Sequence, residues 1–464
     1  MKKVLVTIAA LGLVAGVATA ASAVEWQISG KYMVEGAYLS KSEGNGVLPY
    51  ETPGVSKSSD AYYLHTFEIN PSMKVNDKIS MYSVVRLAQD NFWGSQYDTV
   101  GNKMSESDKN SSVYIHRLYM EYMSPIGKFR IGRTPAGDWG TSFLDFDQRA
   151  DRIILYPSFL AFGPFSTQFY IQKSTDNQKD HTKTYIDQSD ADKDKYVARA
   201  FYKTDMVDSG LEYAISHNKN YSSSTTNPAF GLPVNAAGVE SDVQQDISPY
   251  VKLKIDNFYA NGELFYLFGS KDYDHALAPT KADQDYKAWA GMLNIGGKFD
   301  KLDVGAMYFY AEGQKLNDNN ITTPLGGVGT GDLFEPFYVL TGRHTGILNN
   351  TLFNGLTSSA SAAGASAAGV YANYAVSDKL TVHGAVGYAK ADEKVFYTPA
   401  GVLTATQNSS YGWEYDLGMA YKLLDNLTYE AHFGYLDAGD YFKLDGSVDA
   451  KNIFVLSHSL TMTF

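Results

Sequence analysis

The chain has 464 residues, a formal net charge of −12 and no cysteine. The lack of cysteine excludes disulfides, thiol catalysis, iron–sulfur ligation and covalent haem attachment, and the acidic balance argues against nucleic acid as a partner. The 35 tyrosines, 24 phenylalanines and 41 glycines are a composition that fits the aromatic girdles of a β-barrel in a membrane.

The first 23 residues have the organisation of a secretory signal peptide. Two lysines precede the apolar run 4–17, and the small residues Ala21-Ser22-Ala23 follow it as a cleavage site. The mature chain is expected to begin near Val24, with a cut after Ala20 as the alternative. Beyond this signal we find no apolar run of about 18 residues that could span a bilayer as a helix, which does not count against a barrel because alternating strands average to neutral hydropathy.

From Trp26 onward the chain shows a period of two, the pattern of a β-strand with two different faces. In the first run Trp26 and Ile28 share a face that suits lipid, whereas Gln27 and Lys31 share a face that suits water. Each run is long enough to cross a bilayer at the tilt of a barrel strand, which takes about 9 to 11 residues. The same alternation recurs in the runs 63–75, 79–87, 114–122, 251–255, 258–266, 289–295, 302–308, 413–419, 427–435 and 454–464.

Short turns and long polar connections alternate between these runs, as they do in outer-membrane barrels. Short turns are expected near 206–209, 256–257, 300–301, 377–379 and 425–426, and long connections over 174–193, 219–246, 269–284, 314–365, 391–409 and 438–448. This regularity predicts an all-β fold, a transmembrane antiparallel β-barrel that occupies residues 24–464 as one domain.

The count of runs gives 18 strands if 152–156 is one of them. Long connections both precede and follow that run. If both chain ends lie on the same side of the membrane, the number of strands must be even, and the count is even only if 152–156 is a strand. An even count closes a barrel without an exposed edge. The alternative is 16 strands, if the first run only completes the last.

A loop rich in Gly, Asp and aromatic residues interrupts this pattern in the first third of the chain. Gly132-Arg133 ends the strand before the loop, and Ile154, Tyr156 and Ser158 follow it with the spacing (Ile/Val)-x-Tyr-x-Ser-Pro, in which Phe159 stands in place of the proline. In these motifs the chain resembles the trimeric general diffusion porins of the bacterial outer membrane. The resemblance implies a loop that folds back into the barrel and forms its constriction, and a homotrimeric assembly.

The last run ends the chain on Phe464. An alternating last strand that ends in phenylalanine resembles the signal by which the barrel-assembly machinery recognises outer-membrane proteins. The resemblance therefore assigns Phe464 to assembly.

Acidic residues on the loop are expected to face basic residues on the wall. The loop acids are Asp138, Asp145 and Asp147, with Asp151 just beyond, and the basic wall consists of Arg86, Arg117, Lys128, Arg130 and Arg133. Opposed charges at a constriction set a transverse field that passes polar solutes and disfavours apolar ones. The alternatives are that these charges only solvate the barrel interior, or that Arg152 pairs with an Asp to pin the loop. Trp139, Phe143 and Phe146 give the loop as much aromatic as acidic character, which leaves the ion preference open.

Other candidate sites are weak. Asp190, Asp192 and Asp194 have the odd spacing of a calcium loop, but Lys195 stands where glycine is needed and Phe201 where glutamate is needed. We therefore assign no metal and no cofactor. The glycine-rich run 326–332 lacks the Gly-Lys-Ser/Thr of a phosphate loop, and the nine histidines show no H-E-x-x-H pattern.

The sequence thus predicts a porin, a non-enzymatic channel for small hydrophilic solutes and ions in the outer membrane of a Gram-negative bacterium, in contact with lipid and lipopolysaccharide. Three alternatives stay open. The first is a substrate-selective channel whose aromatic loop guides a ligand. The others are an outer-membrane enzyme such as a lipase, and an adhesive surface protein with a plugged barrel.

Overall fold

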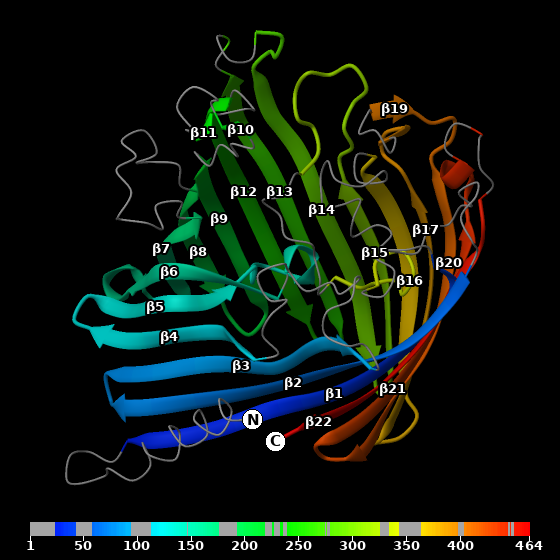
Figure 1. The fold of residues 1–464 in the computed structure, drawn as a ribbon. Helices are drawn as coiled ribbons and strands as arrows, with labels where there is room; N and C mark the ends of the chain where they lie inside the picture. Colours follow the sequence, from blue (N-terminus) through cyan, green and yellow to red (C-terminus); the bar gives the residue numbers. More distant parts are fainter. Residues whose placement is uncertain are drawn as a thin grey trace.

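Eighteen strands form one antiparallel sheet that closes on itself as a barrel (Figure 1). The computed structural model describes residues 24–42, 58–93, 113–145, 147–175, 193–218, 225–226, 233–234, 239–273, 275, 279–324, 334–342, 363–397, 403–443, 446 and 450–464. The expected signal peptide and the glycine-rich run 326–332 lie outside these ranges.

Each barrel strand pairs with the strands before and after it in the chain, so the topology is a simple up-and-down meander. The barrel strands are β1 (Glu25–Ser42), β2 (Ser58–Asn76), β3 (Ile79–Phe92), β4 (Tyr114–Ser124), β5 (Gly127–Ala136), β6 (Gln148–Pro157), β7 (Phe165–Thr175), β8 (Lys193–Lys203), β9 (Val207–Asn218), β12 (Val239–Ile255), β13 (Phe258–Tyr273), β14 (Gln284–Phe299), β15 (Leu302–Ala311), β16 (Ala365–Ala375), β17 (Leu380–Lys390), β20 (Ser410–Leu424), β21 (Leu427–Ala438) and β22 (Ile453–Thr463). Two small hairpins lie outside this sheet, β10 (Thr225–Thr226) with β11 (Pro233–Val234) and β18 (Val395–Tyr397) with β19 (Leu403–Ala405). Three 3-10 turns are η1 (Ser142–Leu144), η2 (Ser158–Leu160) and η3 (Asp440–Lys443).

β1 closes the barrel, because it pairs with β2 on one side and with β22 on the other. In the second pairing Lys31 lies opposite Thr463. The ladder continues to the end of the chain, where Gly30 N donates to Phe464 O at 2.9 Å and Phe464 N donates to Gly30 O at 3.1 Å. β6 pairs with both β5 and β7. The prediction of 18 strands is therefore confirmed, and the alternative of 16 is wrong because β1 and β22 are separate strands.

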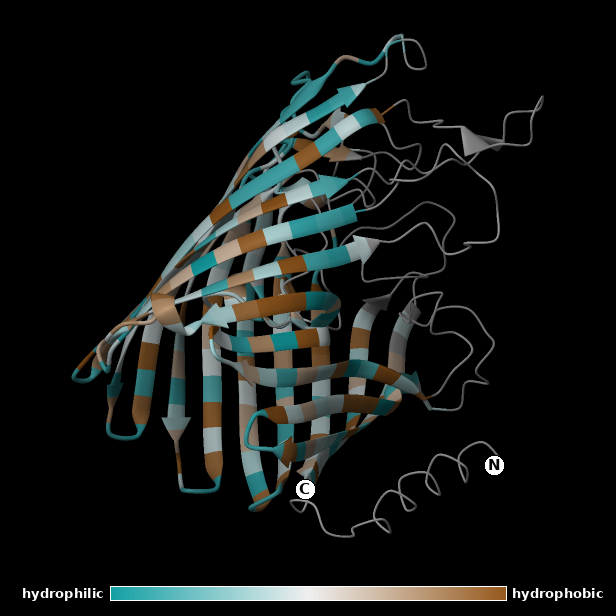
Figure 2. Cartoon of the chain, turned by 90° about the vertical axis from the view of Figure 1, so that its left-hand side faces the viewer, coloured by the Kyte–Doolittle hydropathy of each residue, from teal (hydrophilic) through white to brown (hydrophobic). Residues whose placement is uncertain are grey.

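The two faces of the wall follow the period of two, and Figure 2 shows the resulting bands of alternating hydropathy along the strands. On β1 the side chains of Trp26 and Ile28 are exposed on the outer face, whereas Glu35 and Leu39 are buried on the inner face. An apolar outer face is what lipid requires of a barrel wall. Among the described residues, no helix is long and apolar enough to cross a membrane.

Two segments from the connections fold into the barrel. One is the loop 137–147 between β5 and β6, which was expected there, and its Phe143 is fully buried. The other is the segment 334–342 between β15 and β16, whose Phe334, Val339 and Leu340 are at most 1% exposed. This second infolded segment lies within the long connection expected over 314–365, and its place inside the barrel was not predicted from the sequence.

Candidate pore constriction

A buried carboxylate of the wall holds the tip of the loop 137–147. Glu263 on β13 accepts two hydrogen bonds at Oε2, from Thr141 N at 2.6 Å and from Thr141 Oγ1 at 2.7 Å. Gly140 has φ +64°, and a Cβ on it would lie 2.6 Å from Glu263 Oε2. Only glycine adopts this conformation at such a close approach without cost, so Gly140 lets the loop backbone reach the wall.

Aromatic side chains fix the rest of the loop. Trp139 Nε1 donates to the carbonyl and the hydroxyl of Ser248 at 3.1 and 3.0 Å, and its ring lies edge-on to Tyr250 with centroids 5.0 Å apart. Phe143 packs edge-on against Phe334 of the other infolded segment, 5.1 Å between centroids. The aromatic residues that left the ion preference open are thus packing residues; Phe146 lies outside the described residues.

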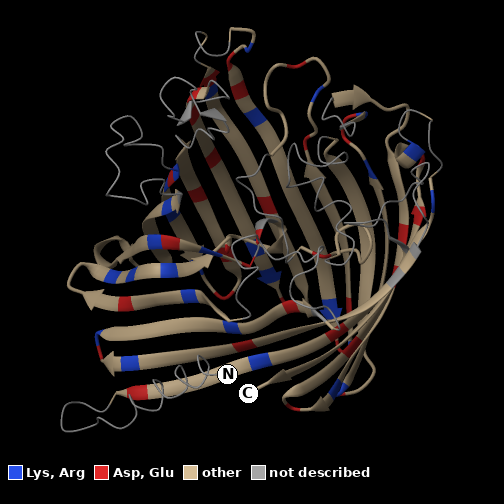
Figure 3. Cartoon of the chain, in the orientation of Figure 1, with Lys and Arg blue, Asp and Glu red and all other residues tan. Residues whose placement is uncertain are grey.

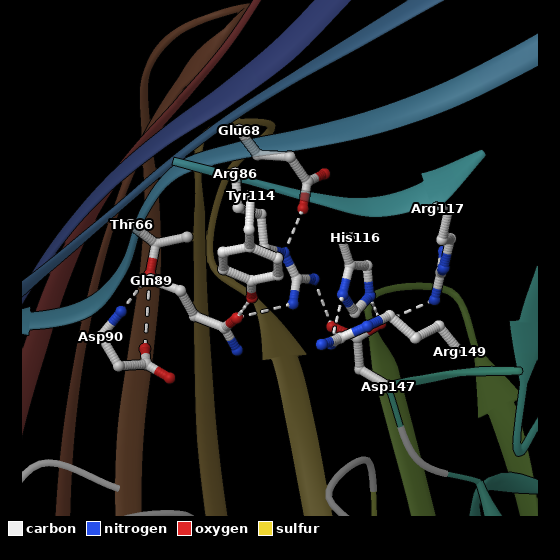
Figure 4. Close-up of polar contacts among 10 residues, drawn as sticks. All are labelled: Thr66, Glu68, Arg86, Gln89, Asp90, Tyr114, His116, Arg117, Asp147 and Arg149. Carbon is white, nitrogen blue, oxygen red and sulfur yellow. Dashed lines mark hydrogen bonds and ion pairs between the residues drawn. The ribbon is translucent and has the colours of Figure 1, made fainter. Parts of the chain in front are cut away.

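Asp147 lies in direct contact with the basic wall (Figure 4). Its carboxylate accepts hydrogen bonds from Arg86 and from Arg117, the latter at 2.6 Å, and His116 Nε2 lies 3.3 Å away. Arg149 Nη1 in turn lies 3.2 Å from His116 Nδ1. Burial alone raises the pKa of Asp147, but the hydrogen bonds from His116 and Arg86 outweigh burial and hold that pKa well below its usual range. Asp147 is therefore negatively charged at neutral pH and offsets part of the positive charge of the basic wall.

Three further hydrogen bonds complete this first cluster. Arg86 Nε donates to Glu68 at 2.8 Å and Arg86 Nη1 donates to Gln89 at 3.0 Å, and the Tyr114 hydroxyl also donates to Gln89. The cluster holds three guanidinium groups, of Arg86, Arg117 and Arg149, against the carboxylates of Glu68 and Asp147. These guanidinium groups exceed the two carboxylates by one charge, and the carboxylate of Asp90, which accepts from Thr66 Oγ1 at 3.3 Å at the edge of the cluster (Figure 4), offsets that charge.

A second cluster lies on β4 and β5. Glu121 accepts from Lys128 at 3.2 Å and from Arg130 Nη2 at 2.7 Å. Both cations also lie over the ring of Tyr156, at 4.6 and 5.9 Å from its centroid. Two cations against one carboxylate leave one positive charge. Figure 3 shows the recurring Lys and Arg bands on these strands.

A third cluster, on β6, β8, β9 and β12, was not predicted as part of the wall. Arg199 Nε donates to Glu212 at 2.5 Å, and Lys195 Nζ lies 3.7 Å from Asp246. Among the residues that the structure describes, Arg152 forms no ion pair with an Asp; it donates to Gln172 at 2.7 Å and to the carbonyl of Pro135 at 3.1 Å. The three cations, Arg152, Lys195 and Arg199, exceed the two carboxylates by one charge. The alternation of β8 was the signal that could have found Lys195 and Arg199, because both share the face of the buried Val197.

The two remaining loop acids lie beside this third cluster. Asp138 is exposed, and its carboxylate acts electrostatically on Arg199. Asp145 accepts a hydrogen bond from Trp139 N at 2.7 Å. Burial, together with the nearby charge of Asp138, raises the pKa of Asp145 to about 6, against the effect of that hydrogen bond.

Lowering the pH from about 7.5 to about 5 is therefore expected to shift the ion preference of the channel toward anions. Asp145 is charged above its raised pKa and neutral below it, so the loop loses one negative charge in this range. Reversal potentials in a KCl gradient at the two pH values measure the shift. D145N should begin near the low-pH value and respond less to pH. An equal pH response in D145N would contradict the assignment.

The structure corrects the placement of two predicted site residues. Arg133 and Asp151 lie opposite each other on β5 and β6, on the face that carries the exposed Ile153, and Arg133 Nε donates to Asp151 at 3.2 Å. That face is the outer one, so neither residue lines the pore. The reason is parity: Arg133 stands three positions after Arg130, and an odd step changes the face of a strand.

A neighbouring outer-face pair involves one of the three candidate calcium ligands. Asp194 lies 3.0 Å from Lys173 Nζ. Asp190 and Asp192 lie outside the described residues, and no group of three or more His, Cys, Asp or Glu that could hold a metal ion occurs in the part of the chain that the structure describes.

Comparison with known proteins gives matches in structure alone. No protein-family model matches the chain, and no curated protein matches its sequence. Among solved structures, OccK9 (OpdG) of Pseudomonas aeruginosa is 12% identical with a TM-score of 0.53, over 95% of this chain and 98% of that one. OccK8 (OprE) of the same species is 10% identical with a TM-score of 0.51, over 94% and 98%. A BenF-like porin from Pseudomonas fluorescens is 11% identical with a TM-score of 0.50, over 94% and 99%.

At these identities the likeness is one of fold. It extends over nearly the whole of each chain, and it agrees with the closed sheet of eighteen strands. The chain has the fold of the outer-membrane porins.

Proposed function

We propose that the protein is an outer-membrane porin of a Gram-negative bacterium, whose barrel interior forms a water-filled channel for passive diffusion of small hydrophilic solutes and ions. A barrel of this strand number encloses more space than its wall side chains fill. The proposal involves no chemical step, and selectivity comes from the bore and from the charges that line it.

The observation that carries this proposal is the exposure of charged side chains inside the barrel. The side chains of Arg117, Lys128, Arg130 and Asp147 keep 24%, 30%, 21% and 36% of their surface exposed. All four lie on the inner face or on the infolded loop, so solvent that reaches them is inside the barrel. Isolated charges are too costly to bury without water or full pairing, which supports an aqueous path along β3 to β8.

Liposome swelling tests the proposal. Purified protein in liposomes should admit small neutral sugars, at a rate that falls as the sugar becomes larger. Swelling no faster than in protein-free liposomes would contradict a diffusion channel and favour the plugged-barrel alternatives, the enzyme and the adhesin.

A specific observation favours a substrate-selective channel as the second candidate. Basic and aromatic side chains interleave on the inner face: Arg152 lies 4.4 Å from the ring centroid of Tyr170, and Arg199 lies 4.7 Å from that of Trp139. Such cation–π pairs offer planar anionic solutes both charge and a stacking surface. A saturable block of the current by one class of solute would favour this candidate, and a current that stays linear in solute concentration would favour simple diffusion.

The remaining expectations from the sequence belong to this proposal. We propose export through the signal peptide 1–23 with cleavage before Val24, a homotrimer in contact with lipid and lipopolysaccharide, and insertion by the barrel-assembly machinery. The exposed apolar outer face supports contact with lipid. The proposed trimer predicts conductance steps that occur in threes.

Replacing Phe464 with alanine is expected to lower the amount of folded barrel in the outer membrane more than it changes conductance. The ring lies over Gly30 at the seam of the barrel, where a Cβ on Gly30 would come within 2.4 Å of it, and the backbone of Phe464 closes the ladder to β1. The amount of heat-modifiable barrel in isolated membranes measures the effect. L460A, an apolar truncation on the same outer face of β22, is the control. Equal membrane levels of the two variants would contradict a special role of Phe464.

A further inference from the structure

The segment 334–342 is packed into the barrel as tightly as a protein core. Phe337 is 3% exposed, and Val339 and Leu340 are fully buried. A turn closes the segment on itself, since Phe337 N donates to Thr341 Oγ1 at 3.0 Å and Thr341 Oγ1 donates to Phe337 O at 2.9 Å. Its conformation is thus set both locally and by the wall.

A buried carboxylate of the wall binds the backbone of this segment. Glu414 on β20 accepts from Val339 N at Oε1, 2.5 Å, and from Leu340 N at Oε2, 2.8 Å. Two positions along the same face, Asp416 accepts from Tyr338 N at 3.4 Å. Glu414 is fully buried, and within the described residues it forms no ion pair with a cation. A carboxylate in such a place is costly unless donors satisfy it, and here the donors are the backbone of the infolded segment.

Four glycines on adjacent strands make room for the side chains of the segment. A Cβ on Gly387 of β17 would lie 2.2 Å from the ring of Phe337, and one on Gly369 of β16 would lie 2.7 Å from it. A Cβ on Gly418 of β20 would lie 2.7 Å from the hydroxyl of Tyr338, and one on Gly434 of β21 would lie 2.9 Å from its Cβ. All four occupy inner-face positions, so the wall is hollowed where these rings lie against it.

Further contacts beside these four glycines hold the segment 334–342 against the wall. The Tyr338 hydroxyl lies 2.8 Å from His432 Nδ1 on β21. Phe334 lies edge-on to both Phe309 of the wall and Phe143 of the loop 137–147, with centroids 5.1 Å away in each case. The two infolded segments therefore meet inside the barrel and support each other.

We propose that Glu414 and the glycines 369, 387, 418 and 434 form an internal docking site for the segment 334–342, which fills the half of the barrel lined by β14 to β21 and confines the solute path to the charged half lined by β3 to β9. Glu414 is the positioning residue of this site. The inference rests on the proposed channel function, because it states which part of the interior conducts.

Cysteine labelling tests the docking independently of transport. The natural chain has no cysteine, so V339C introduces a single thiol at a fully buried position of the segment. In the folded protein in detergent we expect this thiol to react with a polar maleimide at least about tenfold more slowly than a thiol on an exposed short turn, D378C. E414A and G387V, each combined with V339C, should abolish that protection. Fast labelling of V339C in the otherwise natural chain would overturn the docking.

Single-channel conductance tests whether the docked segment confines the solute path to one half of the barrel. E414A and G387V should each raise the single-channel conductance roughly twofold, since the vacated half of the barrel adds cross-section. G384V is the matched control, because Gly384 lies on the outer face of the same strand and its Cβ would meet only the backbone oxygen of Asp416, at 3.8 Å. Unchanged conductance in variants that label fast would overturn the confinement of the path. If the natural protein conducted no current while the thiol of V339C still reacted slowly with the maleimide, the channel function would be contradicted and the docking supported.

Discussion

Replacing Glu263 with alanine is expected to raise the single-channel conductance roughly twofold, because it releases the loop 137–147 from the wall and widens the narrowest part of the barrel. Glu263 is 2% exposed and accepts both donors of Thr141 at one oxygen. Removing this acceptor would leave two buried donors of Thr141 unsatisfied, which costs about 1–3 kcal/mol for each group. Planar bilayer recordings of the two proteins measure the effect.

E263Q is the matched control for this prediction. Both donors of Thr141 go to Oε2, and Oε1 accepts no hydrogen bond from any described residue. A glutamine that places its oxygen at Oε2 keeps both bonds, so E263Q should conduct like the natural protein. Equal conductance of E263A and the natural protein would show that other contacts, such as those of Trp139, suffice to hold the loop.

The second prediction concerns charge. D147N is expected to shift the permeability ratio toward anions by about tenfold at low salt, because a unit charge about 5 Å from a passing ion contributes about 0.8 kcal/mol in water, with opposite signs for an anion and a cation. Asp147 neutralises part of the cluster of Arg86, Arg117 and Arg149. Its neutralisation makes the net charge of this cluster more positive by one. Reversal potentials in a salt gradient measure the shift, which should shrink as the salt concentration rises.

D151N supplies the control for D147N. Asp151 carries the same charge four positions further along, but it lies on the outer face and pairs with Arg133. The ion preference of D151N should equal that of the natural protein. If D151N shifted the reversal potential as much as D147N, the assignment of inner and outer faces in this part of the wall would be wrong.

The architecture of the barrel could be predicted from the sequence because one simple pattern encodes it. A period of two distinguishes the lipid face from the inner face in each strand, and turn residues such as Asp256 and Asp300, both with positive φ, mark the short hairpins. The strand count followed from parity, and β6 lies where parity required a strand. Such features are local in the sequence, so no knowledge of tertiary contacts was needed.

The interior was predicted less completely because its contacts join residues far apart in the chain. The glycine at 387 and the glutamate at 414 look ordinary in their own strands, and their role appears only when the segment 334–342 lies against both. The inner placement of Arg199 could have been read from the alternation of β8, but its partners Glu212 and Trp139 come from two other elements and could not. By contrast, the outer placement of Arg133 follows from counting positions along β5, so the sequence alone contained the means to correct that prediction.

Single-channel recording of the purified protein in a planar bilayer, with a salt gradient across it, tests the central claim most directly. We expect discrete conductance steps and a measurable reversal potential, since water and ions pass along the charged inner face of β3 to β9. The absence of any current from protein that is correctly folded and inserted would contradict an open channel.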